Sequence, residues 1–113
     1  MSQNAKPGIV CWATMPIQGT LERKARPVLV VSSRPFTSRT GLVHLLPITT
    51  TPPSRWETLP AKLATGKLDP KSRIVLDILI TEDEKVLGEK LGEVEPGLLA
   101  QAVQGFTATL ETE

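Results

Sequence analysis

The chain has few of the side chains that metal sites and disulfide-stabilised folds require. Its 113 residues contain one cysteine, Cys11, and one histidine, His44. A single thiol cannot form an internal disulfide, and one thiol with one imidazole provides too few ligands for a structural zinc site. We therefore expect a protein that uses no metal ion and no other cofactor.

Aromatic residues and long apolar runs are also scarce. The chain has two tryptophans, two phenylalanines and no tyrosine, so any surface that stacks on nucleic-acid bases must be sparse. The N-terminal apolar stretch, residues 9–17, is interrupted by Pro16 and is far too short to cross a bilayer. We expect a cytoplasmic protein that does not contact a membrane.

Charge is unevenly distributed along the chain, although the net charge is only +1. Residues 1–75 carry eleven Lys and Arg against three acids, whereas residues 76–113 carry two against nine. This pattern indicates either a basic surface for a polyanion or ordinary solvated charge at the two ends of a domain. It favours nucleic-acid binding without establishing it.

The pattern of apolar residues predicts one mainly β domain, an α+β fold rich in strands, over residues 1–113. Short runs rich in β-branched residues alternate with breaker clusters. Long connections are expected at residues 15–25 and 35–40, and a turn at residues 66–71. The expected strands are residues 9–13, 28–32, 42–48, 57–62, 73–80 and 89–94, of which 57–62 is weak.

One helix is expected, from Pro96 to Leu110. Proline suits the first turn of a helix, and apolar residues recur every fourth position from Leu98 through Ala102 and Phe106 to Leu110. The resulting apolar stripe must be covered by the sheet or by a partner subunit.

The most informative local feature is Arg26-Pro27 at the start of one apolar run, because the next run ends at Thr49 and Thr50. Arginine is always charged and presents a planar fork of donors that matches phosphate oxygens, and a threonine hydroxyl can donate a further hydrogen bond. The pair predicts a phosphate site. The simpler alternatives are an exposed arginine at a strand start and threonines that satisfy a turn.

These features occur in an order that resembles the MazF/PemK family of bacterial toxins. The resemblance rests on Gly8 with Trp12, on Gly19, and on Thr40-Gly41. It also rests on three longer pieces, which are Arg26-Pro27-Val28-Leu29-Val30-Val31-Ser32, Pro47-Ile48-Thr49-Thr50 and Leu76-Asp77. The chain departs from the usual family pattern at Leu21, which shifts the loop acid to Glu22, and at Ile78, where a glutamine is common.

The resemblance implies an SH3-like small β-barrel of five to seven strands with a C-terminal helix. It further implies the toxin of a type II toxin–antitoxin system: a homodimeric, metal-independent endoribonuclease that cuts single-stranded RNA. Cleavage would proceed by attack of the 2′-hydroxyl and leave a 2′,3′-cyclic phosphate. A MazE/PemI-like antitoxin would neutralise the toxin.

The resemblance places the catalytic arginine at Arg26 and the catalytic threonine at Thr49. The chemistry agrees, because with one histidine the chain cannot use a two-histidine route, whereas Arg26 and Thr49 can stabilise charge on the phosphoryl oxygens. Asp77 either serves RNA binding or makes a purely structural hydrogen bond. The residues expected to bind RNA are Gly19, Thr20, Glu22, Arg23, Lys24, Thr50, Trp56 and Asp77.

Other functions on the same fold are possible interpretations of the sequence. The main alternative is a non-cleaving homologue, either a CcdB-like inhibitor of DNA gyrase or a protein that binds RNA without cutting it. A further alternative is a degenerate homologue that has lost its activity and serves as a structural or regulatory partner. In the gyrase case the critical residues would lie on the terminal helix rather than at Arg26.

Overall fold

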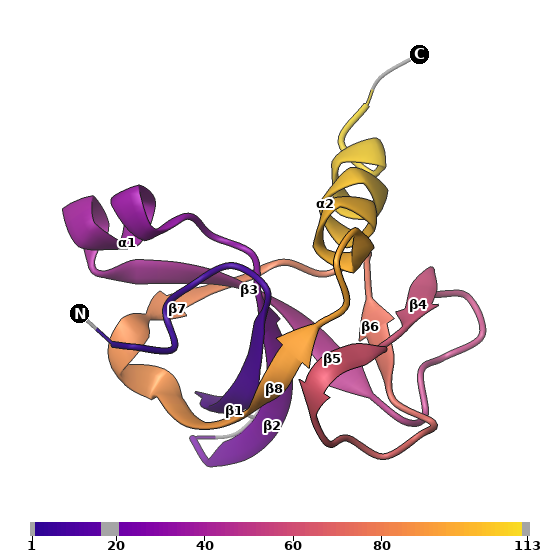
Figure 1. Ribbon diagram of the computed structural model, residues 1–113, viewed down its shortest axis with the longest axis horizontal. Helices are drawn as coiled ribbons and strands as arrows, with labels where there is room; N and C mark the ends of the chain where they lie inside the picture. Colours follow the sequence, from indigo (N-terminus) through magenta and orange to yellow (C-terminus); the bar gives the residue numbers. More distant parts are fainter. Residues whose placement is uncertain (1, 17–20, 112–113) are drawn as a thin grey trace.

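The computed structural model describes residues 2–16 and 21–111. These residues form eight strands, two α-helices and a short 3-10 turn (Figure 1). In chain order the elements are β1 (Ile9–Pro16), β2 (Arg23–Val30), α1 (Arg34–Thr40), β3 (Leu42–Thr49), β4 (Thr58–Pro60), β5 (Leu63–Gly66), β6 (Arg73–Val75), β7 (Ile80–Asp83), the 3-10 turn η1 (Glu84–Val86), β8 (Leu87–Val94) and α2 (Leu98–Ala108).

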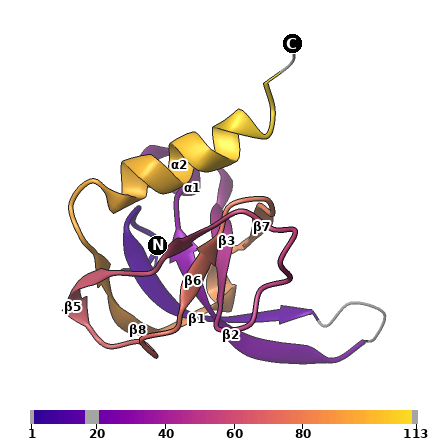
Figure 2. The same cartoon turned by 90° about the vertical axis from the view of Figure 1, so that its right-hand side faces the viewer.

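The strands form one antiparallel sheet in the order β4-β6-β3-β2-β1-β8-β5, and β7 pairs with the first half of β3. The sheet curls into a small barrel with α2 packed over one side (Figures 1 and 2). The β1–β2 hairpin projects on the side away from α2 (Figure 2). The expected fold class is confirmed, with eight strands in the described part of the chain instead of five to seven.

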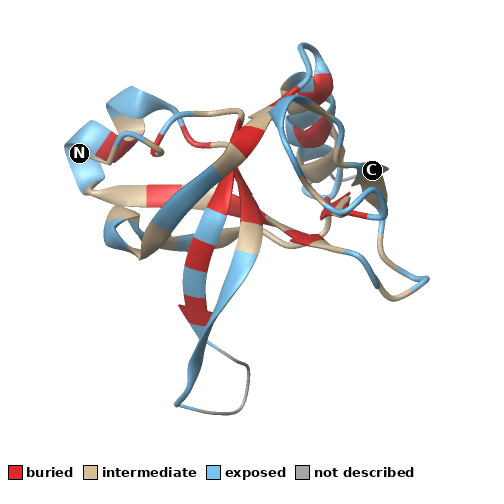
Figure 3. Cartoon of the chain, turned by 60° about the horizontal axis from the view of Figure 1, so that its bottom comes forward, coloured by how far each residue is buried: buried red, intermediate tan, exposed pale blue. Residues whose placement is uncertain are grey.

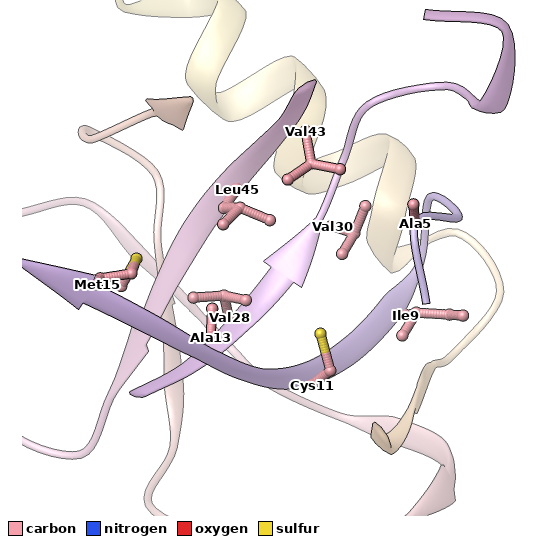
Figure 4. Packing of buried hydrophobic residues seen from close by; sticks show 9 residues of the cluster. All are labelled: Ala5, Ile9, Cys11, Ala13, Met15, Val28, Val30, Val43 and Leu45. Carbon is pink, nitrogen blue, oxygen red and sulfur yellow. The ribbon is translucent and has the colours of Figure 1, made fainter. Parts of the chain in front are cut away.

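The central strands bury both of their faces, because successive side chains of a strand point to opposite sides. Val28 and Val30 of β2 belong to one apolar cluster with residues of β1 and β3 (Figure 4), and Leu29 belongs to a second cluster under α2. Toward its end β1 alternates buried and exposed residues (Figure 3). Burial of Cys11 in the first cluster raises the pKa of its thiol to about 11 by desolvation.

Residues 34–40 form a helix, so the expectation of an irregular connection there was wrong. Ser33 caps the helix by accepting a hydrogen bond from the Phe36 amide, and Pro35 lies in the first turn. Gly41 ends it in the left-handed conformation, with φ of 73°. All of these signals are local, but a helix of seven residues carries too short an apolar pattern to stand out.

The β1–β2 hairpin is longer than expected. The loop was expected to run from Met15 to Ala25, but β2 begins at Arg23 and pairs with β1 as far as Pro16. Strand β2 also ends at Val30, two residues before the expected end. Polar and charged residues form this outer part of β2, and the pairing with β1 keeps them extended where their own β-propensity would not.

The apolar run at residues 73–80 is divided between two strands, so the expectation of one long strand was wrong. Its first part is β6, whose Ile74 pairs with Ile48 of β3. Its last residue, Ile80, begins β7 and pairs with Leu45 of β3. The same strand β3 therefore binds both ends of the run, which requires the chain to bend in between. Strand β5 in the stretch 63–66 was not expected either.

Helix α2 begins two residues later than expected, after Gly97, so Pro96 lies before its first turn. Leu98 and Ala102 are buried against the second cluster, but Leu110 lies beyond the helix and is 66% exposed. Phe106 is partly buried against the same cluster, so of the expected stripe only Leu110 is left uncovered by the barrel. No helix in the described part of the chain is long and apolar enough to cross a membrane.

We predict that Gly92→Ala destabilises the protein. A Cβ at position 92 would lie 2.1 Å from the Thr65 carbonyl oxygen in the neighbouring strand β5, so the backbones must separate. The expected loss of unfolding free energy, measured by urea denaturation, is about 1–3 kcal/mol. Gly88→Ala in the same strand is the control, because its Cβ would meet its nearest atom at an ordinary 3.5 Å. Equal stability of the two variants would contradict the prediction.

Candidate active site

Arg26 of β2 and Thr49 of β3 lie just beyond the stretch over which these two strands pair. Strands β2 and β3 pair with Val28 opposite Pro47. Two residues beyond this pair, Arg26 of β2 and Thr49 of β3 line one cavity, where Arg26 is paired with β1 and Thr49 with β6. The strand pairing therefore places the two side chains together, although 22 positions separate them in the sequence.

The side chains of Arg26 and Thr49 lie on the same faces of β2 and β3 as the residues of the first apolar cluster. Val28 and Val30 of β2, and Val43 and Leu45 of β3, face that cluster. Since alternate residues of a strand share a face, Arg26 extends the row on β2 and Thr49 extends it on β3. The polar pair thus lies where the packed interior ends.

A cavity of about 780 Å³ opens at this place, and Arg26 and Thr49 both line it. Arg26 is the one ionisable side chain among the described residues of its wall. Arg26 is exposed to solvent, so its guanidinium is accessible to an anion that enters the cavity. The other lining residues are Met15, Pro16, Pro47, Ile48, Thr51, Pro53, Trp56, Val75, Ile78 and Ile80.

A second arginine lies beside this cavity. In the pairing of β3 with β6, Arg73 is the partner of Thr49. Its Nε donates a hydrogen bond of 2.6 Å to the hydroxyl of Thr58. The two ion pairs of the described residues are Arg23–Glu82 and Lys90–Glu93, so Arg73 is in neither. Its charge adds to the positive potential around Thr49, a contribution that the sequence pattern did not reveal.

The loop before β4 brings Trp56 into the cavity wall. The Arg55 guanidinium lies 5.8 Å from the centre of the Trp56 ring. An Asp77 carboxylate oxygen accepts the Glu57 amide at 2.8 Å, and the Leu76 amide donates to the Glu57 carbonyl. Asp77 does not line the cavity among the described residues, whereas its neighbour Ile78 does. The geometry favours the structural interpretation of Asp77, which anchors the loop that carries Trp56.

The charged residues at the start of β2 have different surroundings. Lys24 is opposite Met15 and therefore shares a face with Arg26, one step further out along the hairpin. Arg23 points elsewhere: its Nη2 lies 3.0 Å from Glu82 Oε1 and donates to the Thr14 carbonyl at 2.7 Å. Lys24 is thus better placed than Arg23 to contact an anion bound at Arg26.

The remaining predicted RNA-binding residues do not meet in this cavity. Gly19 and Thr20 lie outside the described residues, and Glu22 is exposed just before β2. Thr50 faces away from Thr49 and lines a separate cavity. The structure therefore brings together Arg26, Thr49 and Trp56 from the predicted set, with Lys24 near them.

His44 is part of a different arrangement. Its Nδ1 lies 2.7 Å from the Thr81 hydroxyl, and the Phe36 ring stacks on it with the ring centres 4.5 Å apart. It precedes Thr49 by five residues in β3 and lies on the opposite face. Among the described residues, no group of three or more His, Cys, Asp or Glu side chains is arranged to hold a metal ion.

The comparison with protein families decides what kind of protein this is. A sequence model of PemK-like, MazF-like toxins of type II toxin–antitoxin systems matches residues 6–110. The chain belongs to this family. The resemblance inferred from the order of the motifs is thereby confirmed. No curated protein sequence is significantly similar to the chain.

Solved structures of MazF proteins have the same fold. A MazF from Deinococcus radiodurans is 26% identical, with a TM-score of 0.68 over 93% of this chain and 94% of that one. An endoribonuclease from a mycobacterial species is also 26% identical, with a TM-score of 0.65 over 97% and 94% of the two chains. A MazE–MazF structure from Deinococcus radiodurans, at 23% identity, has a TM-score of 0.73 and covers 99% and 100%.

We predict that Asp77→Ala destabilises the loop around Trp56 while Asp77→Asn does not. An asparagine oxygen can still accept the Glu57 amide, whereas alanine leaves that amide without its partner. Urea denaturation should show a loss of about 0.5–1.5 kcal/mol for the alanine variant. If Asp77→Asn instead abolished RNA binding at unchanged stability, a direct role in reading a base would replace the structural one.

Proposed function

We propose that the protein is the endoribonuclease toxin of a type II toxin–antitoxin system and that Arg26 and Thr49 act on the scissile phosphate of single-stranded RNA. The observation that carries the proposal is the presence of these two side chains in one cavity whose described wall has no other ionisable group. Family membership supports it, as does the similar mycobacterial structure described as an endoribonuclease. The proposal treats residues 1–113 as one domain acting in the cytoplasm, where mRNA is available.

In this mechanism the RNA provides its own nucleophile. The 2′-hydroxyl attacks the adjacent phosphorus and loses its proton to solvent water, the bond to the 5′-oxygen of the next nucleotide breaks and that oxygen takes up a proton, and a 2′,3′-cyclic phosphate forms. Arg26 binds two phosphoryl oxygens through its planar fork as negative charge grows on them. The Thr49 hydroxyl donates a further hydrogen bond to the same group.

The reaction requires two proton transfers, and Arg26 can take part in only one of them. A guanidinium has five N–H donors and no acceptor, so it cannot take the proton of the 2′-hydroxyl, whereas it can donate to the leaving 5′-oxygen. We assign Arg26 charge stabilisation first and proton donation second. Lys24 and Arg73 flank the site, and we assign them attraction of the RNA backbone, which is how most basic side chains contribute to affinity.

The first test is cleavage of unstructured RNA in EDTA, followed by analysis of the product ends. We expect cyclic-phosphate ends and a loss of rate of about 10²–10³-fold in Arg26→Ala. Thr49→Val, which removes only the hydroxyl, should lose about 10–100-fold. Arg34→Ala, an exposed arginine of α1 that lines neither cavity, is the matched control and should cleave normally.

Two results would contradict the proposal. Intact RNA at high protein excess would favour a non-cleaving homologue that binds RNA. Growth inhibition that persists in Arg26→Ala would favour a target other than RNA, such as DNA gyrase.

We also propose that the toxin is a homodimer neutralised by a MazE/PemI-like antitoxin. The similar MazE–MazF structures support the antitoxin, and Val103 and Leu110, two exposed apolar residues of α2 and its end, are available to a partner. An antitoxin segment rich in acids would suit the basic N-terminal part of the chain.

The assembly is checked by light scattering of the purified protein at micromolar concentration. We expect a mass about twice the 12.3 kDa of the chain. Addition of the antitoxin should produce a larger complex and suppress cleavage. A mass of one chain at all concentrations would contradict the dimer.

A further inference from the structure

A second cavity of about 380 Å³ is lined by Pro27 and Thr50, the residues that directly follow Arg26 and Thr49. Trp12 of β1 is paired with Pro27 of β2, so their side chains share a face, and Pro27 directly follows Arg26. The volume is within the range of small-ligand sites, about 300–1,000 Å³. The lining residues are Trp12, Pro27, Thr50, Lys67, Leu68, Asp69, Ser72 and Leu91.

Only the end of β3 and the adjoining residues of β2 separate this cavity from the first. Thr49 and Thr51 line the first cavity, and Thr50 between them lines the second. In the same way Arg26 lines the first and Pro27 the second. Thr50 and Thr51 are exposed, so the dividing wall is a short row of hydroxyls open to solvent. A strand of RNA that crosses this row would reach both cavities.

The side chains of the second cavity suit a nucleotide. The Trp12 indole is 37% exposed and offers a flat apolar face, which is the platform that unpaired bases stack on. Lys67 takes part in neither ion pair of the described residues, so its charge is available to a phosphate. Asp69 adds a carboxylate to the same wall. The face of Trp12 suits a base, the charge of Lys67 suits a backbone phosphate, and the carboxylate of Asp69 can accept a hydrogen bond from the base.

We propose that the second cavity binds the base of an RNA nucleotide close to the scissile phosphate, stacked on Trp12, with Lys67 on the backbone. The inference rests on the proposed ribonuclease function and adds a recognition site to it. Of the two cavities, the first performs the chemistry and the second selects the sequence around the cut.

Asp69 gives this site a preference among bases. Its Oδ1 accepts the Lys71 amide at 2.8 Å, which fixes the carboxylate in place and leaves its other oxygen to accept from a base. An ionised carboxylate only accepts hydrogen bonds, so it favours a base with an exocyclic amino group, such as cytosine. Uracil has a carbonyl oxygen at the position of that amino group, and its one donor on this edge, N3–H, lies between two carbonyl oxygens that the carboxylate repels. The site should therefore prefer cytosine to uracil.

The experiment uses Trp56→Phe protein, in which Trp12 is the one remaining tryptophan of the chain. The probes are 2′-O-methyl hexanucleotides of cytosine or uracil, which cannot be cleaved because the nucleophile is blocked. We expect the cytosine probe to quench Trp12 emission and to bind about tenfold more tightly than the uracil probe. Anisotropy of fluorescein-labelled probes gives the dissociation constants.

Three variants in this background separate the roles of the side chains. Trp12→Leu should weaken binding of the cytosine probe about tenfold, and Trp12→Phe, which keeps a smaller aromatic face, should fall in between. Asp69→Asn should remove the preference for cytosine, because an amide both donates and accepts. The association constant for the probe falls as the salt concentration rises. In Lys67→Ala the magnitude of the slope of its logarithm against the logarithm of the salt concentration should be smaller by about 0.7. Lys85→Ala, an exposed lysine outside both cavities, is the control and should leave the slope unchanged.

The outcomes distinguish this inference from the proposed function. RNA that is cleaved by the Trp56→Phe protein while its Trp12 emission stays unchanged with both probes would overturn the inference and leave the ribonuclease intact. Quenching by an acidic peptide but by neither probe would also overturn it and assign the cavity to a protein partner. If RNA is neither cleaved nor bound, the proposed function fails, and the inference fails with it.

Discussion

The pairing of β2 with β3 is the constraint on which the site depends. This pairing sets Val28 opposite Pro47 in the barrel, and Arg26 and Thr49 follow two residues further along their strands and line one cavity. A shift of one residue would turn one of the two side chains to the other face of the sheet. The buried valines and leucines of the first cluster prevent that shift, because it would expose them to water. The core thus fixes the geometry of polar groups that lie outside it.

The same alternation of side chains gives the protein two different surfaces at one place. Neighbouring residues of β2 and of the end of β3 line two cavities, one with an arginine among mainly apolar residues and one with a tryptophan, a lysine and an aspartate. The first suits stabilisation of charge on a phosphate, and the second suits contact with a base. Specificity and chemistry can then change separately, because substitutions at Trp12 or Asp69 leave the face with Arg26 unaltered.

Much of the fold and part of the site followed from local sequence signals. Arg26-Pro27 and the threonines after Pro47 could be identified because each stands at the boundary of an apolar run, and the order of such pieces indicated the family. Helix α1 was missed because its caps are clear but its apolar pattern is too short. The run at residues 73–80 was assigned to one strand because periodicity cannot show that β3 binds its two ends at separate places.

The sequence by itself determined the family, the mainly β class and the two residues proposed for catalysis, because these depend on residue types and short-range order. Only the tertiary structure decided which distant residues share a surface. Trp12 and Lys67 meet because β1 and β5 both pair with β8, and Asp77 bonds to Glu57 because the chain bends after β6. Such contacts arise from long-range strand pairing, which is determined by burial of the whole core. The residue types at the individual positions do not indicate this pairing.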